Sequence, residues 1–122
     1  MMERIGQCHC GSLRVIATGE PDRVYLCHCK ACQRRTGTAF HFGATYPKQQ
    51  VRLDGERNIY ERDADSGYRI RFHFCPNCGS TLYWEGDRNL LSCHLAENTR
   101  RIPILVEYQA NPRCLDRVAH RA

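Results

Sequence analysis

The clearest periodic pattern of the chain lies between residues 68 and 74, where apolar and polar side chains alternate. The apolar positions are Tyr68, Ile70, Phe72 and Phe74, and the positions between them are Arg69, Arg71 and His73. Successive side chains of a strand point to opposite faces of its sheet. The segment therefore predicts a strand with one apolar and one cationic face. The apolar segment 81–84, which follows after a short turn, predicts its hairpin partner.

Shorter apolar segments predict further strands along the chain. We place them at residues 13–17, 24–26, 40–46, 51–53, 58–60, 89–95 and 104–108. Residues 30–35 predict a helical turn that ends at Thr36 and Gly37. No apolar segment is long enough to cross a bilayer. The expected fold class is mainly β, with small antiparallel sheets and short helical turns, in one domain over residues 1–122.

Nine cysteines change this picture, because most of them lie in three close groups. The groups are Cys8 with Cys10, Cys27 with Cys29 and Cys32, and Cys75 with Cys78. The first residues contain no apolar stretch of the kind found in secretory signals, so we expect a cytoplasmic protein whose thiols stay reduced. Closely spaced cysteines in such a protein are typically metal ligands rather than disulfides.

The simplest division of these thiols gives two zinc sites. The four-cysteine cluster consists of Cys8, Cys10, Cys75 and Cys78, and the three-cysteine cluster of Cys27, Cys29 and Cys32. Four thiolates close the coordination sphere of a structural zinc, whereas three leave a position for water or substrate, as in catalytic sites. The other division, in which the first pair completes the middle group, leaves the Cys-Pro-x-Cys pair short of ligands.

The positive charge of the chain favours binding of small anions, but its distribution does not favour binding of nucleic acid. The net charge is +5, and nearly all basic residues are arginines, whose planar fork matches carboxylates and phosphates. They are spread along the whole chain and form no basic stripe, so we expect no nucleic-acid partner. Lys30, Arg34 and Arg35 are the basic residues nearest to the three-cysteine cluster along the chain.

The cysteine motifs resemble those of a known family. In order they are G-x-C-H-C-G at 6–11, C-H-C-x2-C with a following T-G at 27–37, and F-C-P-x-C-G at 74–79. Over about residues 6–95 the chain is similar to the glutathione-dependent formaldehyde-activating enzyme and centromere protein V family. This resemblance implies a tent-like β fold, with a structural zinc at the four-cysteine cluster and a catalytic zinc at the three-cysteine cluster.

The resemblance also implies a reaction. It is the addition of glutathione, or another thiol, to formaldehyde, which gives the S-hydroxymethyl adduct and is a carbon–sulfur lyase activity in the reverse sense. An open zinc site suits this chemistry, since a metal deprotonates a bound thiol and polarises an aldehyde oxygen. The expected partners are therefore a small thiol and an aldehyde, with no membrane. Lys30, Arg34 and Arg35 are expected to hold the carboxylates of glutathione.

Two other functions remain open at this stage. One is a non-catalytic zinc module that binds glutathione or nucleic acid. The other is a thiol-redox enzyme that uses Cys93 or the pair Cys29 and Cys32. Cys93 and His94 stand where relatives commonly carry a glycine and a small hydroxyl residue, although a cysteine on a buried strand is commonly an inert apolar residue. His9, His28, His41 and His73 are expected to have no metal-binding role.

Overall fold

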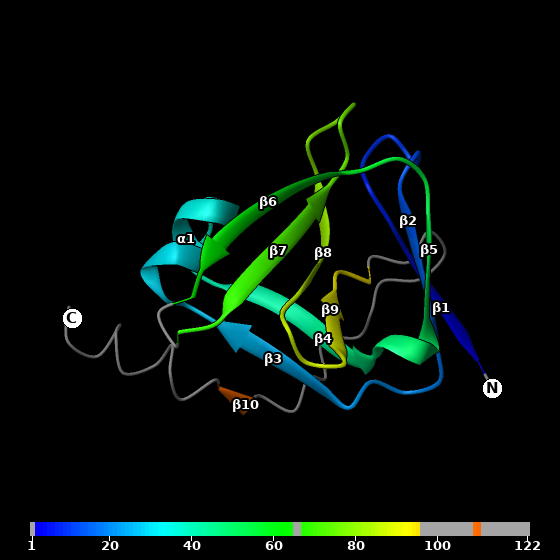
Figure 1. Cartoon of the computed structure of the whole chain (residues 1–122), viewed down its shortest axis with the longest axis horizontal. Coiled ribbons are helices and arrows are strands. Elements are labelled where there is room, and N and C mark those ends of the chain that lie inside the picture. The colour runs from blue at the N-terminus through cyan, green and yellow to red at the C-terminus, as the bar shows by residue number, and fades with distance from the viewer. Residues whose placement is uncertain (1, 65–66, 96–108, 111–122) are drawn as a thin grey trace.

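Two β-sheets make up the part of the chain that the computed structural model describes, residues 2–64, 67–95 and 109–110 (Figure 1). The small sheet has three antiparallel strands in the order β1 (Glu3–Gln7), β2 (Arg14–Thr18) and β5 (Val51–Asp54). Among the described residues, no helix has the length and apolarity needed to cross a membrane.

The large sheet has seven strands and carries the helix. Its order is β10 (Gln109–Ala110), β3 (Arg23–Cys27), β4 (His41–Pro47), β9 (Leu90–Cys93), β8 (Thr81–Glu85), β7 (Arg69–Phe74) and β6 (Asn58–Asp63). Neighbouring strands are antiparallel except for β10 and β3. Helix α1 (Lys30–Thr36) links β3 to β4, and a 3-10 turn at Lys48–Gln50 follows β4.

The predicted mainly β fold with antiparallel sheets and a short helix is confirmed. The predicted hairpin of β7 and β8 is present, with Phe72 opposite Trp84. The predicted strand at 104–108 lies outside the described residues, as does the tail around Cys114. Strand β1 was not predicted. Its side chains show little alternation, and the segment is a strand because it pairs along its length with β2.

The two faces of the large sheet build two separate cores. Buried residues of the small sheet, such as Val15, pack with Tyr46 and Tyr83 on one face. On the other face, Phe72 and Trp84 form a second cluster, which includes the three-cysteine cluster and which we call the aromatic face. Figure 1 shows α1 and the small sheet on opposite sides of β7 and β8. The fold therefore places the four-cysteine cluster and the three-cysteine cluster on opposite faces of the large sheet.

Candidate metal centres

The four-cysteine cluster joins the loop after β1 to the turn between β7 and β8. The four sulfur atoms lie within 4.8 Å of one another. The Cys10 sulfur lies 3.6 Å from that of Cys8 and 3.6 Å from that of Cys75. In a tetrahedral site with zinc–sulfur bonds of about 2.3 Å, neighbouring sulfurs are about 3.8 Å apart. The donor set and its spacing therefore fit a four-coordinate zinc ion.

Both halves of this cluster end in the sequence Cys-Gly-Ser. Gly11 and Gly79 have φ values of 84° and 77°, the left-handed region that favours glycine. The turn brings the following serine back to the sulfurs, so that the Ser12 hydroxyl lies 3.0 Å from the Cys10 sulfur. The Ser80 hydroxyl lies 3.3 Å from the Cys78 sulfur. Neither serine was predicted to take part in the site, although the repeated tripeptide was a signal for both.

Hydrogen bonds favour thiolates at the exposed side of this cluster. Bonds from Ser80 lower the pKa of Cys78 to about 5, and bonds from Ser12 lower the pKa of Cys10 to about 7. Burial raises the pKa of Cys8 instead, although the backbone N–H of Leu13 donates to its sulfur at 3.2 Å. Cys10 and Cys78 therefore favour the thiolate form, which binds a cation, even without a bound metal.

The three-cysteine cluster lies where β3 leads into α1. Cys27 is the last residue of β3, Cys29 caps the helix by accepting the backbone N–H of Cys32 at 3.4 Å, and Cys32 lies in the first turn. The Cys27 sulfur lies 3.6 Å from that of Cys29 and 3.2 Å from that of Cys32. Three sulfurs at these distances fit one face of a zinc tetrahedron and leave one position for another ligand.

The thiols of this cluster depend on reduction and on a metal. In this structure Cys27 is disulfide-bonded, so metal binding through its sulfur requires that this bond first be reduced. Burial raises the pKa of Cys32 to about 12, and the charges of Arg35 and Arg62 lower it by less. A bound cation would therefore be needed to turn Cys32 into a thiolate near neutral pH.

Arg35 is the cation that the structure fixes beside this cluster. Its Nη2 lies 2.7 Å from Nδ1 of His41, and its guanidinium carbon lies 5.4 Å from the ring centre of Trp84. The indole N–H of Trp84 donates to the Tyr25 hydroxyl at 2.9 Å. Of the three basic residues predicted here, Lys30 and Arg34 are exposed. Their predicted role toward glutathione stays a prediction.

His41 and Arg62 belong to this environment, and neither was predicted to have a role in the site. Burial, followed by the charge of Arg35, lowers the pKa of His41 to about 2, so this imidazole is neutral. His41 lies opposite Cys27 in the pairing of β3 with β4. Arg62 comes from β6, its guanidinium carbon lies 5.3 Å from the ring centre of Phe72, and its charge lowers the pKa of Cys32.

Cys93 belongs to neither cysteine cluster. It is fully buried in the core between the sheets, and its sulfur lies 3.7 Å from the Ala44 carbonyl oxygen. Burial raises the pKa of Cys93 to about 12. A buried thiol with a high pKa is a poor nucleophile, so the geometry argues against the redox role that we left open for Cys93.

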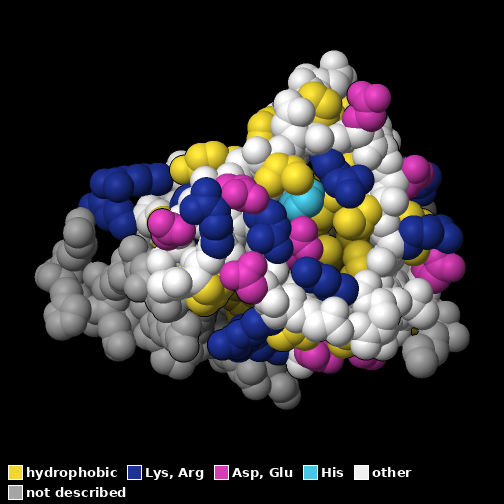
Figure 2. All heavy atoms as spheres, in the orientation of Figure 1, with side chains coloured by type: hydrophobic (Ala, Val, Ile, Leu, Met, Phe, Trp, Pro, Cys, Tyr) yellow, Lys and Arg dark blue, Asp and Glu magenta, His cyan; other side chains and the backbone are white. Residues whose placement is uncertain are grey.

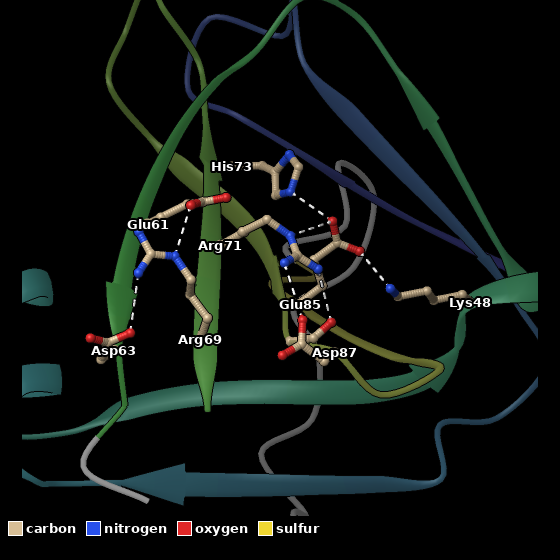
Figure 3. Close-up of polar contacts among 9 residues, drawn as sticks. Lys48, Glu61, Asp63, Arg69, Arg71, His73, Glu85 and Asp87 are labelled. Atoms are coloured by element: carbon tan, nitrogen blue, oxygen red, sulfur yellow. Dashed lines mark hydrogen bonds and ion pairs between the residues drawn. The ribbon is translucent and has the colours of Figure 1, made fainter. Parts of the chain in front are cut away.

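The cationic side of β7 is neutralised by acidic side chains rather than open to anions (Figure 3). Glu85 lies 3.0 Å from Lys48, 3.2 Å from His73 and 3.5 Å from Arg71. Arg69 pairs with carboxylates of β6. Basic and acidic side chains are interspersed over the face seen in Figure 2. This arrangement does not favour a nucleic-acid interface.

Comparison with known proteins gives matches of three kinds. The family model described as "Glutathione-dependent formaldehyde-activating enzyme" matches residues 3–98. A protein of Schizosaccharomyces pombe named an uncharacterized lyase is 31% identical over 84 residues, which are 69% of this chain and 58% of that protein. The chain thus spans less than two thirds of that relative. A crystal structure of a Rhodobacter sphaeroides protein shares the fold, with a TM-score of 0.60 and 21% identity over 81% of this chain and 91% of that one.

Proposed function

Since the chain belongs to the glutathione-dependent formaldehyde-activating enzyme family, we propose that it is a zinc-dependent carbon–sulfur lyase. The reaction is the addition of glutathione, or another thiol, to formaldehyde, giving the S-hydroxymethyl adduct. One observation carries the proposal, namely three cysteine sulfurs that fit a single metal ion and leave a coordination position for a substrate. The four-cysteine cluster has no such position and serves the fold.

The reaction balances without a further reagent. The thiol sulfur forms a bond to the aldehyde carbon, the π electrons of the carbonyl move to its oxygen, and that oxygen takes up the proton that the thiol has lost. Zinc at the three-cysteine cluster, when bound, supplies a lowered thiol pKa and a polarised aldehyde oxygen.

The surrounding residues favour the charged form of the substrate thiol. Arg35 is half-buried between the helix and the aromatic face, and His41 holds its guanidinium in place. Positive charge at short range in a partly dry site stabilises a thiolate more than it would in water. The buried aromatic rings of Trp84 and Tyr25 limit the access of water from the sheet side.

The test combines metal content with catalysis in reduced protein. We expect zinc analysis to find two ions per wild-type chain and one in Cys32→Ser. Exchange between formaldehyde and glutathione, followed by NMR, should exceed the uncatalysed rate in the wild type and return to it in Cys32→Ser. Cys93→Ala is the matched control, because it removes a buried thiol outside both clusters and should keep both ions and the exchange rate.

Other outcomes would contradict specific parts of the proposal. A wild type that binds a single ion would remove the open metal site. Two bound ions with exchange at the uncatalysed rate would leave a non-catalytic zinc module, the alternative that the sequence left open. Activity that survives zinc removal but is lost in Cys93→Ala would restore the thiol-redox alternative.

A further inference from the structure

Two guanidinium groups converge on one aromatic ring beside the three-cysteine cluster. The guanidinium carbons of Arg35 and Arg62 lie 4.9 Å and 5.3 Å from the ring centre of Phe72. Arg35 comes from α1 and Arg62 from β6, the edge strand of the large sheet. The pairing of β6 with β7, and of β7 with β8, places Arg62 on the same face as Phe72 and Trp84. Segments far apart in the sequence thus bring two cations to one place.

These two cations lack an acidic partner in the part of the chain that the structure describes. The ion pairs there involve Arg4, Lys48, Arg69, Arg71 and His73. Arg35 contacts the neutral ring of His41, and an arginine can only donate hydrogen bonds. His41 therefore accepts the bond but does not neutralise the charge of Arg35. Arg69 and Arg71 differ from this pair, because they project from the other face of the sheet and form ion pairs with carboxylates (Figure 3).

The metal would not cancel this charge. A zinc ion with three thiolates carries one negative charge, and the two guanidinium groups carry two positive ones. Among the described residues one positive charge then remains at a half-buried position, where a charge without a partner is costly. An anionic group on the substrate would compensate for it. Neighbouring like charges at a functional site commonly indicate the charge of the ligand.

We propose that Arg62, acting with Arg35, binds a carboxylate of the thiol substrate and makes the site selective for anionic thiols. This inference rests on the proposed function for the identity of the reacting thiol. Arg62 is the adjustable member of the pair. It is half-buried, and its hydrogen bond to a described residue runs from Nη1 to the carbonyl oxygen of Asp63 at 3.3 Å, which leaves other N–H groups for a carboxylate.

The first test measures binding without catalysis. The probe is S-methylglutathione, which keeps both carboxylates of glutathione but has no free thiol for a metal. We expect its Kd, from titration calorimetry on reduced, zinc-loaded protein, to rise about tenfold in Arg62→Gln, the effect of one charge-assisted hydrogen bond. The matched control is Arg52→Gln, which removes the same charge from an exposed position of β5 in the small sheet.

The second test separates substrate recognition from chemistry. In the exchange reaction, Arg62→Gln should raise the KM for glutathione about ten times more than the KM for 2-mercaptoethanol, which has no carboxylate. Zinc content should match that of the wild type, which excludes general damage to the cluster. The conservative variant Arg62→Lys should restore part of the affinity for glutathione.

The outcomes distinguish this inference from the proposed reaction. If S-methylglutathione does not bind to the wild type, or binds equally well to Arg62→Gln, the anion site is wrong whatever the catalytic result. Equal effects on both thiols would also overturn it. If the wild type shows no catalysis but binding of S-methylglutathione depends on Arg62, the lyase proposal fails and the anion site stands.

Discussion

Gly43 on β4 offers the sharpest test of how tightly the aromatic face is packed. A Cβ atom at this position would lie 2.7 Å from Cζ2 of Trp84 and 3.1 Å from both Cζ and the hydroxyl oxygen of Tyr25. Both rings are buried, and they are hydrogen-bonded to each other. Neither ring can therefore move away without disturbing its neighbours, so Gly43→Ala should overpack this face.

The cost follows from three contributions. Overpacking a well-packed core costs about 1–3 kcal/mol, and weakening the bond between Trp84 and Tyr25 costs about 1 kcal/mol. Alanine recovers about 0.5–1 kcal/mol through its smaller loss of backbone entropy. We expect Gly43→Ala to lower the free energy of unfolding by about 2 kcal/mol, which for a domain of this size is a fall in Tm of about 8 °C.

Thermal unfolding of reduced, zinc-loaded protein measures this loss. The matched control is Gly86→Ala, where the new Cβ would meet the exposed side chain of Tyr68 at 3.3 Å. That side chain can yield, so the control should change stability by no more than about 0.5 kcal/mol. Exchange activity should fall more in Gly43→Ala than in Gly86→Ala, because a displaced Trp84 ring would disturb its contact with Arg35. If both variants lose the same stability, the packing argument is refuted.

Three further predictions concern the metals, a buried hydroxyl and a charge network. Cys8→Ser should lose one zinc ion and several kcal/mol of stability, whereas Cys32→Ser should lose one ion and remain folded; zinc analysis and urea unfolding check both, and equal destabilisation would contradict the division into structural and catalytic sites. The Tyr83 hydroxyl is buried and has no hydrogen-bond partner among the described residues, so Tyr83→Phe should stabilise the protein by about 1 kcal/mol. Burial raises the pKa of Tyr83 to about 12 from 10, so wild-type stability should fall as pH rises from 10 to 12, and this fall should be smaller in Tyr83→Phe. Burial raises the pKa of Glu85, but its bonds to Lys48 and His73 outweigh this and lower the pKa below 4.5. The stability that Glu85 provides is therefore present above pH 4.5 and lost as pH falls through its folded pKa. In unfolding measured from pH 6 to 3, the free energy of unfolding of Glu85→Gln should therefore fall less than that of the wild type.

Local patterns predicted much of this architecture. The hairpin of β7 and β8 could be predicted because apolar and polar side chains alternate along a short continuous segment of the sequence. The three-cysteine cluster could be predicted because its thiols lie within six residues, 27–32. The other four thiols could be grouped because ligand number leaves few choices, and the structure brings them together.

Features that depend on long-range pairing could not be predicted. The place of His41 beside Arg35 follows from the pairing of β4 with β3, and that of Arg62 from the pairing of β6 with β7. Adjacent side chains of a helix point in different directions. For this reason the sequence could not show that Arg35 contacts the aromatic face while Arg34 is exposed.

The four-cysteine cluster has a consequence for how the chain folds. It brings the sulfurs of Cys10 and Cys75, which are 65 positions apart, to within 3.6 Å, so a metal bound there would close a long loop across the two sheets. A cross-link over such a distance removes on the order of 4 kcal/mol of chain entropy from the unfolded state. The hairpin of β7 and β8 can form from nearby residues, whereas a metal bound by all four cysteines would fasten this longer loop. If zinc binds there, the fraction of folded chains should follow the supply of zinc, so that metal binding is part of folding.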